Sequence, residues 1–282
     1  MNLLAGQPHL AVGVALAGKP FSVAIHGGEW QDYPLGGWLL KKLLAASNLI
    51  LTSSSTTAAF WVPEKCQPKV VTVVPWLPKF ALQLLSEFTK DKNLSQFRAP
   101  IRVLTVARSS LRKGIQRLVT AIQICRKLGV NISLTIAGQK QGDTYVDPNV
   151  GGVEFAGNVD DGALRQLYLD AQVFALLPEQ LPGGEGWEGF GIVYLEAAAA
   201  GLPILASNTG GVAEALSPHG SFLLEEGCSP EDIAAVLIDL ADSNEVYQQM
   251  VGANKTWAES QQWKNRSEKI QALLTMLKAS NA

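Results

Sequence analysis

Short apolar runs alternate with amphipathic segments along most of the chain. Apolar runs at 101–107, 132–138 and 173–178 are interleaved with stretches such as 115–129, in which apolar positions recur every three or four residues. This alternation of strands and helices is typical of a parallel sheet that is covered by helices on both faces. We therefore predict a Rossmann-like α/β domain over residues 98–258.

A shorter series of the same kind precedes this domain. Strands are predicted at 21–25, 49–52 and 69–74, and a polar stretch with some helix at 81–99 is typical of an interdomain linker. Since a βαβ unit takes about 30 residues, residues 1–97 have room for about half of a full Rossmann-like domain. We assign them to a partial N-terminal domain with its linker.

A glycine-rich loop and a short helix stand out in the second domain. Glycine costs about 1 kcal/mol relative to alanine inside a helix, so the five glycines between 183 and 191 favour a loop. Residues 192–200 favour a helix, which Gly201 and Pro203 end. The unpaired N–H groups and positive dipole at the start of this helix favour a bound phosphate.

Two carboxylates flank the start of this helix, eight positions apart. Glu188 precedes the helix, and Glu196 lies about 7 Å along its axis at 1.5 Å per residue. Each carboxylate can accept hydrogen bonds from a vicinal diol. Two alternatives stay open from the residues alone: a solvated glutamate that favours the helix dipole, and the acid and nucleophile pair of a glycosidase. The apolar neighbours of Glu196 favour a buried carboxylate that needs partners.

The stretch EGFGIVYLEAAAAGLPILAS, residues 188–207, resembles the E-x(7)-E signature of retaining glycosyltransferases of family 4. That family has the GT-B fold and uses nucleotide-sugar donors. The resemblance implies that Glu188 contacts hydroxyls of the donor sugar and that Glu196 holds the ribose diol. The backbone amides that would face the sugar and the phosphates belong to Gly189, Phe190, Gly191 and Ile192.

Cations follow the first strand of the second domain. Arg108 and Lys113 can neutralise a diphosphate, although a solvated loop is the more ordinary interpretation of such residues. The segment resembles the family motif A-R-x(4)-K-G, which implies that both side chains grip the donor phosphates, with Arg112 as an extra cation. The resemblance also places Gly138 and Val159 at the base pocket.

His26 directly follows the strand at 21–25, at the sheet edge where open α/β sheets bind ligands. A lone histidine is often a structural hydrogen-bond partner. The family carries a histidine in a similar HG position, which implies that His26 faces the donor sugar and the acceptor. The resemblance assigns Glu214 to loop and helix geometry.

Composition excludes several classes of function. The chain has 282 residues, 47% of them hydrophobic, and a formal net charge of -2, so nucleic acid is not an expected partner. Three cysteines without CxxC spacing and three scattered histidines favour neither a disulfide framework nor a metal site. With no long apolar run or signal segment, we expect a cytoplasmic protein. The basic, apolar helix predicted within 34–48 leaves peripheral membrane contact as an alternative to core packing.

The resemblance implies a GT-B fold with two Rossmann-like parallel-sheet domains, the N-terminal one truncated, and a C-terminal helix at 259–282 that packs back on the N-terminal domain. It implies a retaining transfer of a sugar from a nucleotide-diphosphate donor to an unidentified glycan, lipid or small-molecule acceptor, with no metal or other cofactor. The alternatives are a non-catalytic nucleotide-sugar-binding subunit or remnant, and a GT-B sugar epimerase or a hydrolase. A separate N-terminal fragment that completes the first domain is a further candidate partner.

Overall fold

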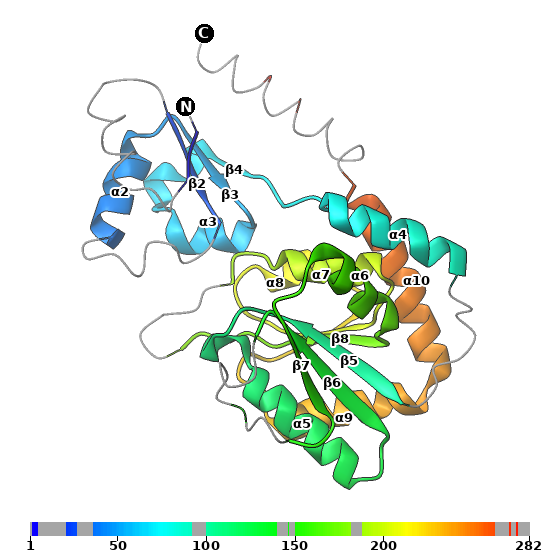
Figure 1. Cartoon of the computed structure of the whole chain (residues 1–282). Helices are drawn as coiled ribbons and strands as arrows, with labels where there is room; N and C mark the ends of the chain where they lie inside the picture. Colours follow the sequence, from blue (N-terminus) through cyan, green and yellow to red (C-terminus); the bar gives the residue numbers. More distant parts are fainter. Residues whose placement is uncertain are drawn as a thin grey trace.

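The protein folds into two α/β domains, each built on a parallel sheet (Figure 1). The structure is a computed structural model, and it describes residues 2–4, 21–26, 36–91, 100–139, 146, 150–181, 188–262, 271 and 275. The first sheet has four strands in the order β1-β2-β3-β4, and the second has six in the order β10-β9-β8-β5-β6-β7. The two-domain parallel α/β architecture predicted from the hydrophobic pattern is therefore observed.

The first domain packs its helices against a small sheet. Its strands are β1 (Asn2–Leu4), β2 (Ser22–Ile25), β3 (Leu49–Thr52) and β4 (Val70–Thr72), and its helices are α2 (Gly36–Ala46), α3 (Ser55–Trp61) and the 3-10 helix η1 (Glu64–Lys69). Leu40, Leu43 and Leu44 lie on one face of α2 and are buried against β2 and β3. Their three- and four-residue spacing gives this helix its apolar stripe. Lys41 and Lys42 stay exposed on the opposite face.

The second domain has the strand order of a dinucleotide-binding fold. Its strands are β5 (Ile101–Val106), β6 (Ile132–Ala137), β7 (Val153–Gly157), β8 (Val173–Leu176), β9 (Ile204–Ser207) and β10 (Ser221–Leu224). After β5 the chain adds β6 and β7 on one side and then returns to place β8 on the other side of β5. Ligands bind such sheets at the carboxyl ends of the strands where the order reverses, which here means beside β5 and β8.

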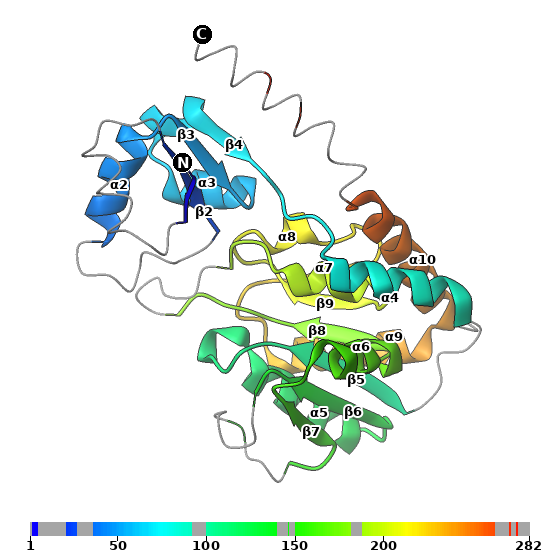
Figure 2. The same cartoon turned by 45° about the horizontal axis from the view of Figure 1, so that its top comes forward.

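Helices cover both faces of the six-stranded sheet (Figure 2). They are η2 (Leu111–Lys113), α5 (Ile115–Lys127), α6 (Asp161–Asp170), α7 (Ile192–Ala199), α8 (Val212–Ala215), α9 (Pro230–Asp242) and α10 (Asn244–Ser260). Helices α5 and α9 pack together on one face, whereas α6, α7 and α10 lie on the other. Among the residues that the structure describes, no helix is both long enough and apolar enough to cross a bilayer.

The segment predicted as a polar linker is instead largely a helix of the second domain. Helix α4 (Lys79–Asp91) packs on α6, α7 and α10. Ala81, Leu84 and Leu85 are buried in the core of the second domain, and Glu87 forms an ion pair with Arg165 of α6. The exposed face of α4 is polar, which hid this narrow apolar stripe in the sequence. Residues 92–99 lie outside the described residues, as does most of the C-terminal helix predicted at 259–282.

Candidate functional site

A cleft of about 560 Å³ lies at the carboxyl ends of β5 and β8, between the two domains. Most of the site residues predicted from the sequence line it. They are His26, Arg108, Lys113, Gly138, Glu188, Gly189, Phe190, Gly191 and Ile192. Ser53 and Pro75 of the first domain also line the cleft, and the sequence had not singled them out. Of the predicted residues, Glu196 and Val159 are not part of this lining.

The helix that follows the glycine-rich loop begins at the cleft without a side-chain cap. Its N-cap residue is Gly191, which adopts a left-handed conformation with φ of 86°. A Cβ atom at this position would lie 2.5 Å from the ring of Tyr194, so the loop requires glycine here. Ile192 and Val193, the first two residues of α7, line the cleft. Uncapped N–H groups at a helix start attract an anion.

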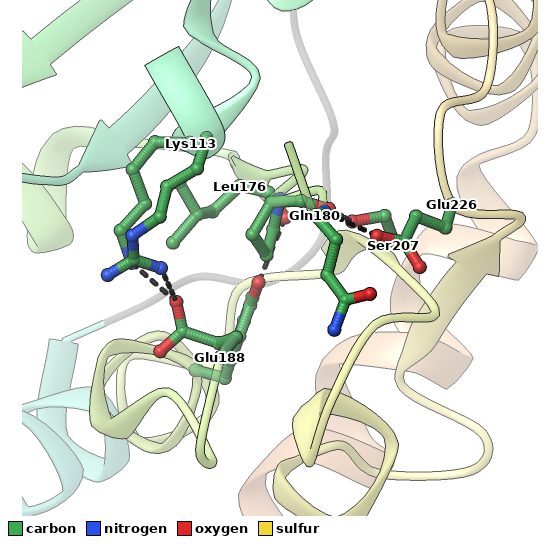
Figure 3. Close-up of polar contacts among 9 residues, drawn as sticks. Lys113, Leu176, Gln180, Glu188, Ser207 and Glu226 are labelled. Atoms are coloured by element: carbon green, nitrogen blue, oxygen red, sulfur yellow. Dashed lines mark hydrogen bonds and ion pairs between the residues drawn. The ribbon is translucent and has the colours of Figure 1, made fainter. Parts of the chain in front are cut away.

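Lys113 is placed by a sharp turn between η2 and α5. Gly114 adopts a left-handed conformation with φ of 67°, and a Cβ atom there would lie 2.1 Å from the carbonyl oxygen of Leu177. Glycine thus lets the basic loop approach the end of β8 closely. The chain that leaves β8 is also fixed from β9, because Ser207 of β9 donates a hydrogen bond to the carbonyl of Pro178 (Figure 3).

Glu188 is held by two cations. Its Oε2 atom lies 2.5 Å from Nζ of Lys113 and 3.1 Å from Nη1 of Arg112, and the three side chains are 12%, 13% and 23% exposed (Figure 3). Burial alone would raise the pKa of Glu188, but the charges and hydrogen bonds of Lys113 and Arg112 outweigh burial and lower the pKa. Glu188 therefore stays ionised at neutral pH.

The cluster around Glu188 holds more positive than negative charge. Burial lowers the pKa of Lys113, Glu188 opposes that effect, and the charges of Arg112 and Arg108 lower the pKa further. Three cations thus act around one carboxylate, and the cluster keeps a net positive charge that suits a diphosphate. Sequence reasoning had treated Arg112 only as an extra cation. Its position directly before Lys113 was the signal available in the sequence.

Glu196 has a different partner. It lies on α7 one turn beyond Ile192, and its Oε2 atom accepts a hydrogen bond of 2.8 Å from the hydroxyl of Tyr168 on α6. Burial raises the pKa of Glu196, the Tyr168 hydrogen bond lowers it, and the charge of Asp161 raises it; the net shift is upward. Tyr168, like Ser53 and Pro75, is a residue that the sequence had not singled out.

Glu214 joins the two domains through the start of α3. Its carboxylate accepts hydrogen bonds from the backbone N–H and the hydroxyl of both Ser55 and Thr56, at 2.9 to 3.0 Å. These bonds outweigh burial, which by itself would raise the pKa of Glu214, and lower that pKa. The sequence analysis expected loop and helix geometry for Glu214. We name this set of bonds the Glu214 clasp.

A second set of bonds ties the glycine-rich loop to the first domain. The hydroxyls of Ser53 and Thr57 donate to the carbonyl oxygen of Gly189, at 3.2 and 3.3 Å. The Ser53 hydroxyl also lies 3.0 Å from the carbonyl oxygen of His26, so the carbonyls of Gly189 and His26 share its one hydrogen. The His26 side chain is exposed at the cleft. The predicted catalytic region of the first domain is therefore anchored on the loop that carries Glu188.

Residues 87–257 match the protein family described as "Glycosyl transferases group 1". The chain belongs to this family. The match includes the basic loop that holds Arg108 and Lys113 and the helix that holds Glu196. Recognition of the family from the two glutamates and their surroundings is therefore confirmed. Within the described ranges, no three His, Cys, Asp or Glu side chains gather in a way that would hold a metal ion.

Curated relatives of the chain include a mannosyltransferase and a glycogen synthase. The chain is 31% identical over 178 residues to a GDP-mannose-dependent alpha-(1-6)-phosphatidylinositol monomannoside mannosyltransferase of Mycobacterium tuberculosis, a match that covers 60% of this chain and 46% of the relative. It is 33% identical over 143 residues to a glycogen synthase of the same organism, covering 49% of this chain and 32% of the relative. These matches span about half or less of each relative.

Solved structures share the fold along nearly the whole chain. The Anabaena protein HepE in complex with UDP-glucose superposes with a TM-score of 0.71 at 14% identity, covering 98% of this chain and 78% of HepE. Sucrose-phosphate synthase from Thermosynechococcus elongatus gives a TM-score of 0.70 at 18% identity, covering 95% of this chain and 71% of the synthase. The predicted GT-B arrangement of two Rossmann-like domains is thereby confirmed.

Proposed function

We propose that this member of the glycosyl transferase family is a retaining glycosyltransferase that moves a sugar from a nucleoside-diphosphate sugar to an acceptor. The observation that carries the proposal is the cation cluster of Arg108, Arg112 and Lys113 at the uncapped start of α7. Cations and helix N–H groups at one point favour a ligand with two adjacent phosphates.

The remaining groups suit the two ends of such a ligand. With the diphosphate at the start of α7, Glu188 at the cleft would accept hydrogen bonds from the sugar to be transferred. Glu196, one turn further along α7, would accept them from the ribose. The names of two similar proteins support this class of donor, because one is GDP-mannose-dependent and the other was crystallised with UDP-glucose.

The chemistry that we propose is a displacement on one face of the sugar. The bond between the anomeric carbon and the departing phosphate oxygen breaks, and a bond from that carbon to the acceptor oxygen forms on the same face. The acceptor proton passes to the departing phosphate, whose growing negative charge Arg108, Arg112 and Lys113 stabilise. The chain supplies this charge stabilisation itself, so the proposal requires no metal. His26, across the cleft, orients the reacting region.

We place this reaction in the cytoplasm. All three cysteines, Cys66, Cys125 and Cys228, are buried free thiols, as is usual in a reducing compartment. A nucleotide-sugar donor is a compatible substrate for that location.

The proposal is tested by calorimetric titration of the Arg108→Ala and Lys113→Ala variants with UDP, GDP, uridine and guanosine. Each variant should bind the diphosphate about ten- to a hundredfold more weakly and the bare nucleoside about as tightly as the wild type, since hydrogen bonds to charged groups contribute about 1.5–3 kcal/mol. Lys127→Ala is the matched control, because Lys127 is an exposed lysine at the far end of α5.

Equal losses for nucleoside and diphosphate would remove the assigned role of the two cations. Incubation of the wild type with UDP-glucose and GDP-mannose then separates the activities. Sugar transfer supports the proposal, whereas tight donor binding without transfer to any glycan, lipid or small-molecule acceptor would favour a binding subunit. A changed sugar still attached to the nucleotide would favour an epimerase.

A further inference from the structure

The hydrogen bond between Tyr168 and Glu196 links a buried hydroxyl to a carboxylate beside the cleft. Tyr168 lies on α6 and is 0% exposed. Its hydroxyl is 2.8 Å from Oε2 of Glu196. A buried hydroxyl without a partner is costly, so Tyr168 and Glu196 fix each other's orientation.

The ring of Tyr168 contacts two other aromatic rings. It stacks on Phe174 of β8, with centroids 6.0 Å apart and an interplanar angle of 22°, and it contacts Phe80 of α4 at 6.1 Å. Such aromatic packing in a fully buried position leaves the ring one orientation. The hydroxyl therefore points in a fixed direction, toward Oε2 of Glu196.

The Glu196 carboxylate keeps one oxygen for another partner. Among the described residues, Oε2 bonds Tyr168, and no partner is found for Oε1. Glu196 follows Ile192 and Val193 by four and three positions, so it shares their face of α7. Ile192 and Val193 line the cleft. The restrained carboxylate thus lies next to the cleft, one turn along the helix from its start.

We propose that Tyr168 is a positioning residue for ribose recognition: its hydroxyl holds the Glu196 carboxylate in the orientation that accepts hydrogen bonds from the 2′- and 3′-hydroxyls of the donor nucleotide. The proposal rests on the proposed function, and it adds a source of specificity for ribonucleotides over nucleotides that lack these hydroxyls. Tyr168 acts through Glu196 and does not contact the reacting atoms.

The electrostatics of Glu196 agree with this role. Burial raises the pKa of Glu196, and the negative charge of Asp161, at the start of α6, raises it further. The Tyr168 hydrogen bond acts in the opposite direction and favours the ionised carboxylate. An ionised carboxylate accepts hydrogen bonds from both hydroxyls of a diol, so Tyr168 favours the form that binds ribose.

The test compares Tyr168→Phe with Tyr194→Phe. Tyr194 belongs to the same aromatic cluster, at 5.9 Å from Phe174, and it is also 0% exposed. Its hydroxyl donates instead to the carbonyl of Leu176, at 3.0 Å. Both substitutions remove one buried hydroxyl and keep the ring, so they cost the fold a similar amount.

Each variant is titrated with UDP and 2′,3′-dideoxy-UDP, and with GDP and 2′,3′-dideoxy-GDP. The wild type should prefer the ribonucleotide by about tenfold or more. Tyr168→Phe should lose most of this preference, because its affinity falls for the ribonucleotide and not for the dideoxy form. As the pH is lowered, the affinity of Tyr168→Phe for the ribonucleotide should start to drop at a higher pH than that of the wild type. Tyr194→Phe should keep the preference and the pH dependence of the wild type.

Two results would overturn the assignment. In the first, Tyr168→Phe binds the ribonucleotide and its dideoxy form more weakly by the same factor, which would mean that the hydroxyl serves only the fold. In the second, Tyr168→Phe keeps the full preference for the ribonucleotide, which would mean that Glu196 needs no support from Tyr168. A wild type that binds UDP or GDP without preferring the ribose form leaves the proposed diphosphate site standing and removes the ribose role of Glu196, and with it that of Tyr168. A wild type that binds neither nucleotide contradicts the proposed function itself, and the inference with it.

Discussion

The surroundings of Glu188 and of Glu196 differ sharply, although the two residues belong to one loop and helix. Glu188 is held by Lys113 and Arg112, and its pKa is lowered. Glu196 is held by the neutral hydroxyl of Tyr168 among apolar neighbours, and its pKa is raised. Two glutamates eight positions apart therefore have opposite electrostatic environments.

Because of this difference, we expect the two carboxylates to behave differently when a ligand binds. Lys113 and Arg112 are the groups that a diphosphate would also seek, so Glu188 competes with a phosphate for them. Among the described residues, Glu196 is bound instead by the hydroxyl of Tyr168, a buried neutral donor for which a phosphate does not compete. Lys113 and Arg112 therefore have to exchange Glu188 for the phosphate on binding, whereas Glu196 keeps its partner Tyr168.

The largest expected effect is on nucleotide affinity, which should change in opposite directions in the Glu196→Gln and Glu188→Gln variants. Glu196→Gln should bind UDP or GDP about tenfold more weakly, because hydrogen bonds from the ribose to a charged acceptor are lost. Glu188→Gln should bind the same nucleotides a few-fold more tightly, because Lys113 and Arg112 lose their competing carboxylate. Transfer of the sugar should nevertheless fall in Glu188→Gln, since the donor sugar loses its partner.

Isothermal titration with UDP and GDP measures the change in affinity, and Glu225→Gln is the control because Glu225 is an exposed acid of the same domain. A loss of nucleotide affinity in both glutamate variants would show that Glu188 does not compete for the cations. An unchanged affinity in Glu196→Gln would remove Glu196 from the ribose site.

A smaller effect is expected on stability, again with opposite signs. At pH 7, Glu188→Gln should lower the free energy of unfolding by about 2 kcal/mol, less than for a fully buried pair because the side chains keep some solvent contact. Glu196→Gln should raise it by about 1 kcal/mol, because ionisation of a buried carboxylate is disfavoured in the folded state.

The two stability effects depend on pH in opposite ways. The contribution of Glu188, whose folded pKa is lowered, is present above the unfolded pKa of about 4.3 and is lost as pH falls through the folded value. The penalty at Glu196, whose folded pKa is raised, develops as pH rises through the interval above about 4.3. Urea unfolding measures these differences, with Glu188→Gln compared with the wild type at pH 7 and below about pH 3, and Glu196→Gln compared at pH 7 and pH 4. For either variant, equal shifts at its two pH values would contradict the assignment.

The smallest effect is expected outside the comparison, at the Glu214 clasp. Glu214→Ala removes four hydrogen bonds between the domains but leaves those of Ser53 and Thr57 to Gly189 in place. Since these bonds are partly exposed, sugar transfer should fall about two- to fivefold, with unchanged UDP or GDP affinity. Hydrogen exchange at the amides of Ser55 and Thr56 should become faster. Unaltered exchange would mean that the clasp does not form in solution.

The sequence predicted local features of this molecule well. The strands at 101–106 and 132–137 and the helix start near Gly191 follow from hydrophobic spacing and glycine placement, which act over a few residues. The position of Glu188, read with Arg108 and Lys113 of the basic loop, also predicted which side chains meet at the cleft, whereas Glu196 lies outside its lining. The roles of these residues stay predictions until they are measured.

Contacts between distant segments could not be predicted. Tyr168 lies 28 positions from Glu196, and Ser55 lies 159 positions from Glu214, so no local pattern pairs them. The apolar stripe of α4 was hidden by polar neighbours, because nothing in the segment itself shows what covers it. The Lys113 to Glu188 bond also depends on a fold that closes 75 positions of chain.

The carbonyl of Gly189 makes the donor loop sensitive to where the first domain sits. It accepts hydrogen bonds from Ser53 and Thr57, while the neighbouring carbonyl of Glu188 accepts one from Gly211 of the second domain. Two consecutive peptide groups are thus anchored to opposite walls. If the first domain moves away from the second, either these bonds break or the loop that carries Glu188 moves with it. Opening of the cleft and release of the donor sugar would then be one movement.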